Sequence, residues 1–218
     1  MKQPQQPWEF SIAFAHMAAV GHVNTGTNLA QAHKTFAETY RRPDGSVDHL
    51  QAIQMAVPAL TNLAFGLELL LKVHHFQHTG QYPKLGRDGH NISKLGRLFP
   101  EASLEKLRRY YQEFHSNPAV PKGIEFRWVV SRVGTSPNTA PWEPKNISTY
   151  DAAIDYVGPM FERWRYIYEE LDLSVEVEAG FSPVYITAMA VHKAIETFEG
   201  GRKVTVKDAP VAGAQNGV

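Results

Sequence analysis

Residues 58–78 read PALTNLAFGLELLLKVHHFQH, and this stretch decides the fold. Leucine, alanine, phenylalanine and valine recur on nearly every side of a helix drawn through it, which predicts a helix that is apolar almost all round. Such a helix belongs at the centre of a bundle. Glu68 and Lys72 lie one turn apart, in the order that favours an ion pair, and mark a narrow charged stripe. Gly80 and Pro83 predict the end of the helix.

Upstream, the sequence predicts two short helices over residues 8–20 and 28–41, with a glycine- and threonine-containing break between them. We interpret residues 1–45 as N-terminal helices that pack on the bundle. A further helix can begin at Ser46, which is a good cap residue. Pro58 either kinks that helix or lies in the first turn of a new one.

Downstream of the central stretch, two helices follow a Gly-His-Asn turn. Asn91 is predicted to cap a short helix that runs through Leu98. The next helix, over residues 103–115, is predicted to pack back against the central one. Its inward face carries Leu104, Leu107, Tyr111 and Phe114. Residues 116–147 are rich in proline around one strand-like run, 125–130, and we interpret them as an excursion from the bundle.

Two more helices complete the bundle, which spans residues 46–200. One is predicted to begin at Ser148, to bend at Gly158-Pro159 and to run to residue 171. The last begins at Ser182-Pro183, a cap followed by proline, and ends at Gly200-Gly201. Its predicted buried stripe is Val184, Ala188, Val191, Ile195 and Phe198.

Two smaller features finish the predicted fold. Residues 175–178 and 203–206 are predicted to pair as a minor β-ribbon. Residues 201–218 are predicted to be a mobile tail because they have little apolar surface to bury. The expected fold class is therefore mainly α, a helical bundle with a proline-rich excursion and a minor ribbon.

Composition excludes several classes of function. Lysine plus arginine equals aspartate plus glutamate at 22 each, so the chain has no overall field that attracts nucleic acid or anionic membrane. The absence of cysteine excludes disulfides, thiolate zinc sites and cysteine nucleophiles. The N-terminus does not have the pattern of a signal peptide, and charged and polar residues interrupt the longest apolar run. We expect a cytoplasmic protein with no membrane partner and no cofactor.

Three runs in the middle of the chain follow one another in a recognisable order: NLAFGLELLLK at 62–72, GQYPK at 80–84 and GHNISKLGRLFP at 89–100. They resemble the HEPN-like helical domains, in which an acidic residue on a core helix precedes a Gly-His-Asn/Asp-Leu turn and a short helix ending in Leu-Phe. The run FERWRYIYE at 161–169 is similar to the closing helix of some members.

The resemblance covers residues 55–115 and 148–171, and it implies a helical bundle that often dimerises. Many HEPN-like proteins are implicated in RNA cleavage, in toxin–antitoxin or phage-defence systems, or in nucleotide binding. Active members carry an arginine followed, after four to six residues, by a histidine. Arg109 and His115 match that spacing here, although the family motif usually lies near the last bundle helix, and residues 148–171 contain no histidine.

Arg109 and His115 are therefore the candidate catalytic pair for metal-independent RNA cleavage. A histidine can accept the proton of a ribose 2′-hydroxyl while an arginine stabilises charge on the phosphate. Six residues along one helix correspond to about 600° of rotation, which leaves the two side chains well apart unless they converge across a dimer interface. The structural alternative is an exposed arginine and a helix-terminal histidine.

A second set of residues is a candidate for ligand binding. It consists of Glu68, His90, Arg163, Arg165 and Tyr166. A buried glutamate, a histidine and arginines would bind a phosphate or nucleotide more readily than cleave one, and arginines beside tyrosine suit contact with RNA. The structural alternatives are that the histidine fixes the angle between two helices and that the arginines form ion pairs.

His74 and His78 have the i,i+4 spacing that can chelate zinc or nickel. Two ligands do not complete a site, and no carboxylate on the same helix is an obvious third ligand, so no metal is predicted. The sequence thus predicts a dimeric, HEPN-like protein that binds RNA or a nucleotide in a stress, defence or toxin–antitoxin system, with ribonuclease activity as an extension. The alternative is a non-catalytic helical module that binds another protein.

Overall fold

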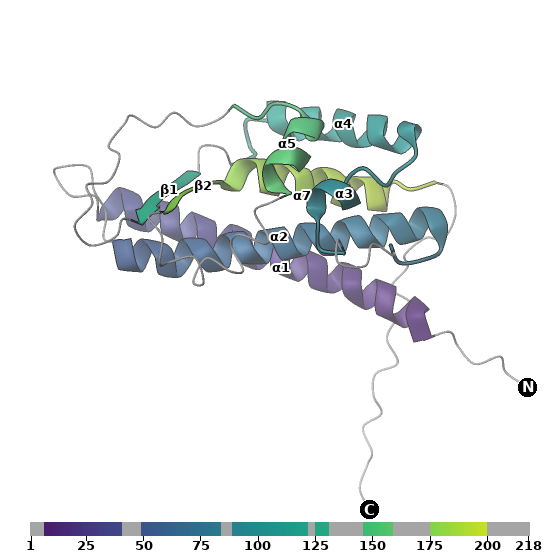
Figure 1. Ribbon diagram of the computed structural model, residues 1–218, viewed down its shortest axis with the longest axis horizontal. Coiled ribbons are helices and arrows are strands. Elements are labelled where there is room, and N and C mark those ends of the chain that lie inside the picture. Colours follow the sequence, from purple (N-terminus) through teal and green to yellow (C-terminus); the bar gives the residue numbers. More distant parts are fainter. Residues whose placement is uncertain are drawn as a thin grey trace, which may run out of the picture.

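The computed structural model describes residues 7–40, 49–83, 89–121, 125–130, 146–158 and 175–199. Within these residues the chain is a mainly α-helical bundle with one two-stranded sheet, and its long helices run along the long axis of the molecule (Figure 1). In chain order the elements are α1 (Pro7–Thr39), α2 (His49–Thr79), α3 (Ile92–Leu95), α4 (Glu101–Ser116), β1 (Glu125–Val130), α5 (Tyr150–Val157), β2 (Val175–Gly180) and α7 (Phe181–Glu196).

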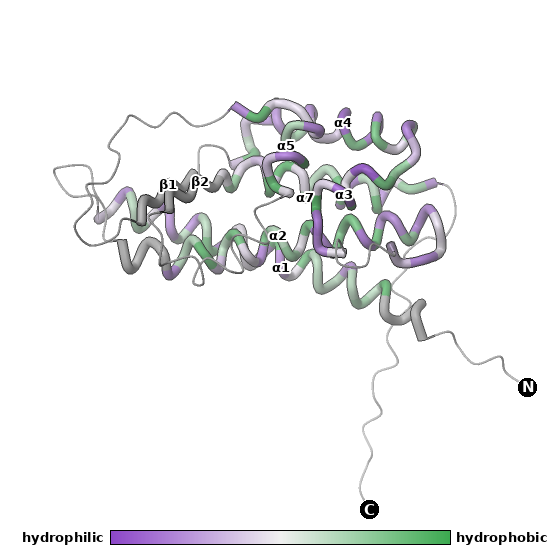
Figure 2. The backbone as a smooth tube through the Cα atoms, viewed as in Figure 1, coloured by the Kyte–Doolittle hydropathy of each residue, from purple (hydrophilic) through white to green (hydrophobic). Residues whose placement is uncertain are grey.

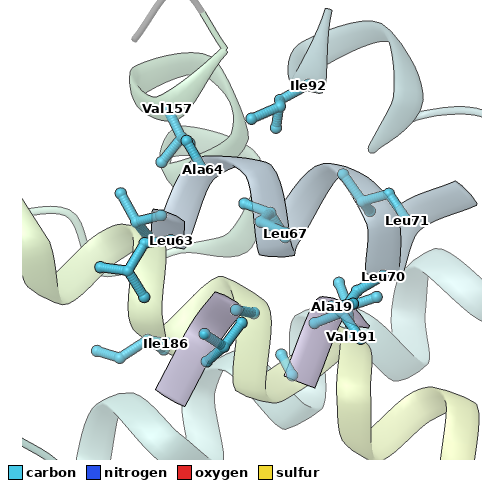
Figure 3. Close-up of a cluster of buried hydrophobic side chains, with 14 of the residues drawn as sticks. Ala19, Leu63, Ala64, Leu67, Leu70, Leu71, Ile92, Val157, Ile186 and Val191 are labelled. Atoms are coloured by element: carbon cyan, nitrogen blue, oxygen red, sulfur yellow. The ribbon is translucent and has the colours of Figure 1, made fainter. Parts of the chain in front are cut away.

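The predicted central helix is confirmed as α2, which packs against α1, α7 and the short α3. Both α2 and α7 are hydrophobic along much of their length, whereas α4 alternates between hydrophobic and hydrophilic residues (Figure 2). Four leucines of α2, Leu63, Leu67, Leu70 and Leu71, are buried among side chains of the surrounding helices (Figure 3). This core includes Ala19, Leu63, Leu67, Leu70, Leu71, Ile92, Val157, Ile186 and Val191.

The predicted break in the N-terminal region is wrong, because α1 runs without interruption from Pro7 to Thr39. Gly26, which suggested the break, lies where α1 meets α2. A Cβ atom at Gly26 would lie 2.6 Å from Cγ of Leu63 and 2.7 Å from the carbonyl oxygen of Ala59. The glycine therefore lets the two helices approach closely, and this packing offsets its poor helix propensity.

The helix α2 continues through Pro58, so of the two predicted alternatives the start of a new helix at this proline is wrong. The side-chain amide of Asn62 donates to the Pro58 carbonyl at 2.8 Å. As predicted, α2 ends at Gly80, which takes the left-handed φ of 70°. By length and composition Gln54–Thr79 could cross a membrane, but 67% of its most apolar window is buried inside the bundle, as in the core helix of a soluble protein.

The Gly-His-Asn turn leads into α3 as predicted. Asn91 caps this helix, since its Oδ1 accepts a hydrogen bond from the backbone amide of Lys94 at 2.9 Å. The helix is shorter than predicted and ends at Leu95. The backbone then turns at Gly96, where a Cβ atom would meet the side chain of Ile154.

The prediction that residues 103–115 pack back on the central helix is wrong, because α4 packs mainly on α7 and α5. Its predicted inward face is correct, with Leu107 and Tyr111 buried and Leu104 and Phe114 partly buried against the core. The amphipathic pattern identified the buried face of α4 but not the helix that covers it. Periodicity carries no information about the partner.

Both later helices are capped differently from the prediction. Thr149 caps α5 in place of Ser148, because its hydroxyl accepts from the backbone amide of Ala152 at 3.3 Å. Gly180 occupies the cap position of α7, and Ser182 lies in the first turn with its hydroxyl buried and unpartnered. The last described helix ends before the predicted glycine pair, at Glu196. Its predicted buried stripe is confirmed at Val184, Ala188, Val191 and Ile195.

The strands β1 and β2 pair antiparallel, with Val130 opposite Val175. Residues 125–130, which the sequence analysis placed in the excursion, are thus the partner of β2 among the described residues. Residues 203–206, most of the proline-rich excursion and the tail 201–218 lie outside the described residues.

Candidate functional site

Glu68 and His90, which the sequence analysis grouped as ligand-binding residues, lie together. Glu68 is 1% exposed on α2, and its Oε1 atom lies 3.0 Å from Nδ1 of His90 and 2.5 Å from Nζ of Lys72. The histidine is 52% exposed, so the cluster reaches the surface through its ring. Because His90 precedes α3, its contact with Glu68 ties the turn to the central helix.

The second oxygen of the Glu68 carboxylate, Oε2, is buried and has no hydrogen-bond partner. Burying a charged oxygen without a donor is unfavourable, and the two donors on Oε1 compensate only in part. The three other residues of the candidate ligand-binding set, Arg163, Arg165 and Tyr166, lie outside the described residues. The structure therefore brings together two of the five predicted residues and adds Lys72 to them.

A larger candidate site lies between α4 and the C-terminal end of α7. It is an open cleft of about 660 Å³. This volume is within the range of about 300–1,000 Å³ that is usual for small-molecule sites. The cleft is lined by Ala102, Glu105, Lys106, Arg109, Tyr110, Thr197 and Glu199.

Three cations surround the ring of Tyr110 at this cleft. The distances to the ring centroid are 4.7 Å from Nζ of Lys193, 5.4 Å from the guanidinium carbon of Arg109 and 5.8 Å from Nζ of Lys106. The tyrosine hydroxyl lies 2.9 Å from the hydroxyl of Thr197. Burial opposes ionisation of Tyr110, but the Thr197 contact and the neighbouring cations outweigh it, and the pKa of Tyr110 is lowered.

The two residues of the candidate catalytic pair, Arg109 and His115, have different neighbours. Arg109 lies at the cleft beside Tyr110. The ring of His115 instead stacks on Tyr111, with 6.0 Å between centroids and 19° between planes. Because Tyr111 is fully buried and its hydroxyl donates to the Ile147 carbonyl, this histidine is directed toward the α5 side of α4.

The histidines proposed as weak metal ligands, His74 and His78, form part of an aromatic cluster. Their rings meet edge to face at 4.7 Å, and both contact Phe99 and Phe198. The amide group of Gln77 donates to the Ile195 carbonyl, so its oxygen accepts from Nδ1 of His74 and leaves Nε2 as a buried, unpartnered acceptor. Burial lowers the pKa of His74 to about 4. In the described part of the chain, no group of three potential ligands could hold a metal ion.

Sequence reasoning missed most of the cleft, because it named Arg109 alone among the residues there. Arg109 and Tyr110 follow Lys106 on α4 by three and four residues, and this spacing is a local signal that both lie near Lys106 on the helix surface. No such signal links them to Thr197 or Lys193. These two residues come from the other end of the chain and reach the cleft only because α7 packs on α4.

Comparisons of the chain with family models, with curated proteins and with solved structures gave no match.

Proposed function

We propose that this protein binds phosphate-bearing nucleotides, either free or within RNA, in the cleft between α4 and α7. The observation that carries the proposal is the convergence of Lys106, Arg109 and Lys193 on the ring of Tyr110. Phosphate oxygens are bound by lysine and arginine, and bases stack on aromatic rings and guanidinium planes. The cleft supplies all of these groups.

The charges around Tyr110 are only partly neutralised. Lys193 pairs with Glu113 at 2.5 Å, and Lys106 donates to the Thr197 carbonyl at 2.7 Å. Arg109 is exposed, and its guanidinium lies against the tyrosine ring. Like charges held near one another repel, so an anion bound among them would be stabilised. A local site of this kind is compatible with a chain that has no net charge.

Two further considerations support the proposal. The resemblance to HEPN-like domains implies RNA or nucleotide binding, and with it a place in a stress, defence or toxin–antitoxin response. The volume of about 660 Å³ is also large enough for one nucleotide. In this account the Glu68–His90 contact is structural, since it fixes the turn before α3.

We propose binding rather than cleavage because of the geometry of α4. Arg109 and His115 lie on one helix, about 600° apart in rotation, which places their side chains about 120° apart. His115 stacks on Tyr111 and does not line the cleft. Among the described residues, His115 therefore does not lie where it could act as the general base on a phosphate held by Arg109 of the same chain. Cleavage by the pair would require a second copy to supply the histidine.

Arg109→Ala is expected to weaken binding of AMP and of a short single-stranded oligoribonucleotide by roughly ten-fold or more, because a charge-assisted hydrogen bond contributes about 1.5–3 kcal/mol. Titration calorimetry on the full chain measures this effect. Arg97→Ala is the matched control, since it removes the same charge from an exposed pair with Asp155 away from the cleft.

Equal loss of affinity in both variants, or none in Arg109→Ala, would contradict the proposed site. The same oligoribonucleotide also tests cleavage when it is incubated without divalent metal. Products that disappear in His115→Ala would extend the function from binding to catalysis. Products that persist in His115→Ala would exclude this histidine as the base.

A specific observation also favours a second candidate function, self-association through the outward face of α1. Phe14 and Met17 are 64% and 58% exposed there, one helical turn apart. Between Glu9 and Lys34 the helix contains no charged side chain other than histidine. In a two-fold symmetric contact the same face of both copies meets, and residues at the axis approach their own copies, so a face without charges avoids like-charge repulsion.

Phe14→Glu is expected to shift the protein toward the monomer, because it places like charges across such a contact. Sedimentation equilibrium of wild type and variant measures the shift. Tyr40→Glu is a matched control, since it introduces a charge at a residue that is 62% exposed near the other end of α1. If the wild-type protein is monomeric at high concentration, self-association through α1 is refuted.

A further inference from the structure

Two carboxylates in the proposed nucleotide cleft have no counter-ion among the described residues. Glu105 and Glu199 line the cleft together with Lys106 and Arg109. Neither glutamate forms an ion pair or hydrogen bond within the residues that the structure describes. By contrast, the other two glutamates of α4 are paired, Glu101 with Arg108 and Glu113 with Lys193.

The cleft is therefore lined by carboxylates as well as by cations. Lys106 is held by the Thr197 carbonyl rather than by a carboxylate, which leaves the two glutamates as acceptors. An ionised carboxylate only accepts hydrogen bonds and repels phosphate. The ligand must therefore place its anionic group near the cations and neutral donors near Glu105 and Glu199.

We propose that the donors are the ribose hydroxyls, so that the cleft selects ribonucleotides over deoxyribonucleotides. This inference rests on the proposed function and names its ligand class. The 2′-hydroxyl is the group by which a protein distinguishes RNA from DNA, and a carboxylate is an effective acceptor for it. Glu105 and Arg109 lie four residues apart on α4, about 6 Å along the helix axis, which is on the scale of a ribose 5′-phosphate.

The charge balance indicates a ligand with a single phosphate. Lys106 and Arg109 are matched in number by Glu105 and Glu199 among the lining residues. A triphosphate would bring more negative charge close to the two glutamates than a monophosphate or one phosphodiester, and it would therefore be repelled more strongly. AMP is therefore the appropriate probe. The matched control ligand is 2′-deoxy-AMP, which differs only in that it lacks the 2′-hydroxyl.

The test is titration calorimetry of the full chain with both nucleotides. AMP is expected to bind roughly ten-fold more tightly than 2′-deoxy-AMP, because a hydrogen bond to a charged acceptor is lost in the latter. Glu105→Met and Glu199→Met remove the acceptors and keep the side-chain length. At least one of them is expected to bring the affinity ratio toward one by weakening AMP alone. Glu38→Met is the control, because it removes a charge from an exposed pair on α1.

The outcomes separate this inference from the function on which it rests. Equal binding of the two nucleotides, with loss of both in Arg109→Ala, overturns the ribose selection and leaves the binding site in place. If Glu105→Met and Glu199→Met both keep the wild-type ratio of AMP affinity to 2′-deoxy-AMP affinity, the role of the glutamates is overturned. Failure of wild type to bind either nucleotide overturns the proposed function and the inference together. Thermal unfolding of each variant checks that these exposed substitutions leave the fold intact.

Discussion

Gly66→Ala and Gly26→Ala are each expected to lower the free energy of unfolding by about 3 kcal/mol, the upper part of the usual range for overpacking. A Cβ atom at Gly66 would lie 2.8 Å from Cγ2 of Val23 and 2.9 Å from the Ala19 carbonyl oxygen. One of these neighbours is backbone, so a side-chain rotation cannot relieve the overlap. The two helices must move apart, and that movement disturbs the core along their whole contact.

Gly21→Ala supplies the matched control for these substitutions. Gly21 lies on the same helix as Gly26, but nothing lies within 4 Å of an added Cβ atom there. Alanine has the higher helix propensity, so this change is expected to raise the free energy of unfolding by up to about 1 kcal/mol. Denaturant unfolding of the three variants measures whether each substitution lowers or raises the free energy of unfolding. If all three were stabilised, the close contact of α1 with α2 would be refuted.

Stability is expected to fall by about 3 kcal/mol between pH 6.5 and pH 4 through His74 alone. Burial lowers the pKa of His74 to about 4 in the folded protein, from an ordinary value of 6.5. Between these values the unfolded chain binds a proton that the folded chain does not, so protonation favours unfolding. The contribution is complete above pH 6.5 and is lost as the pH falls toward 4. His33, whose pKa burial also lowers to about 4, acts in the same direction.

His74→Phe is the variant that isolates this contribution. Phenylalanine does not titrate, and the rings of Phe99, Phe198 and His78 already surround the position. The substitution also removes the unpartnered Nε2 acceptor, but it breaks the hydrogen bond between His74 and Gln77. Unfolding free energies measured at several pH values should show a shallower acid dependence than in wild type. Parallel curves for the two proteins would mean that folding does not lower the pKa of His74.

Several helices could be predicted because their signals are local. The apolar run of α2, its end at Gly80 and the Asn91 cap of α3 each depend on residues within a few positions of one another. The break predicted near Gly26 is wrong because it, too, was inferred from local signals alone. A glycine has low helix propensity in isolation, and only contact with Leu63 turns it into a packing residue.

The two candidate sites also differ in how far local sequence signals could predict them. The sequence analysis grouped Glu68 with His90, and the turn that carries His90 is the next described feature after the end of α2 in the chain. The cleft was not expected beyond Arg109. It depends on α4 packing against α7 instead of α2, and amphipathic spacing reveals which face of a helix is buried but not which helix covers it.

By itself, then, the sequence determined that residues 58–78 form the buried centre of a helical bundle and where several helices begin and end. Backbone propensity and local hydrogen bonds fix these features. The tertiary structure alone decided that α1 is continuous, that β2 pairs with β1, and that Thr197 and Lys193 join Arg109 at Tyr110. Those contacts join residues far apart in the chain, and they arise from how whole helix faces fit together.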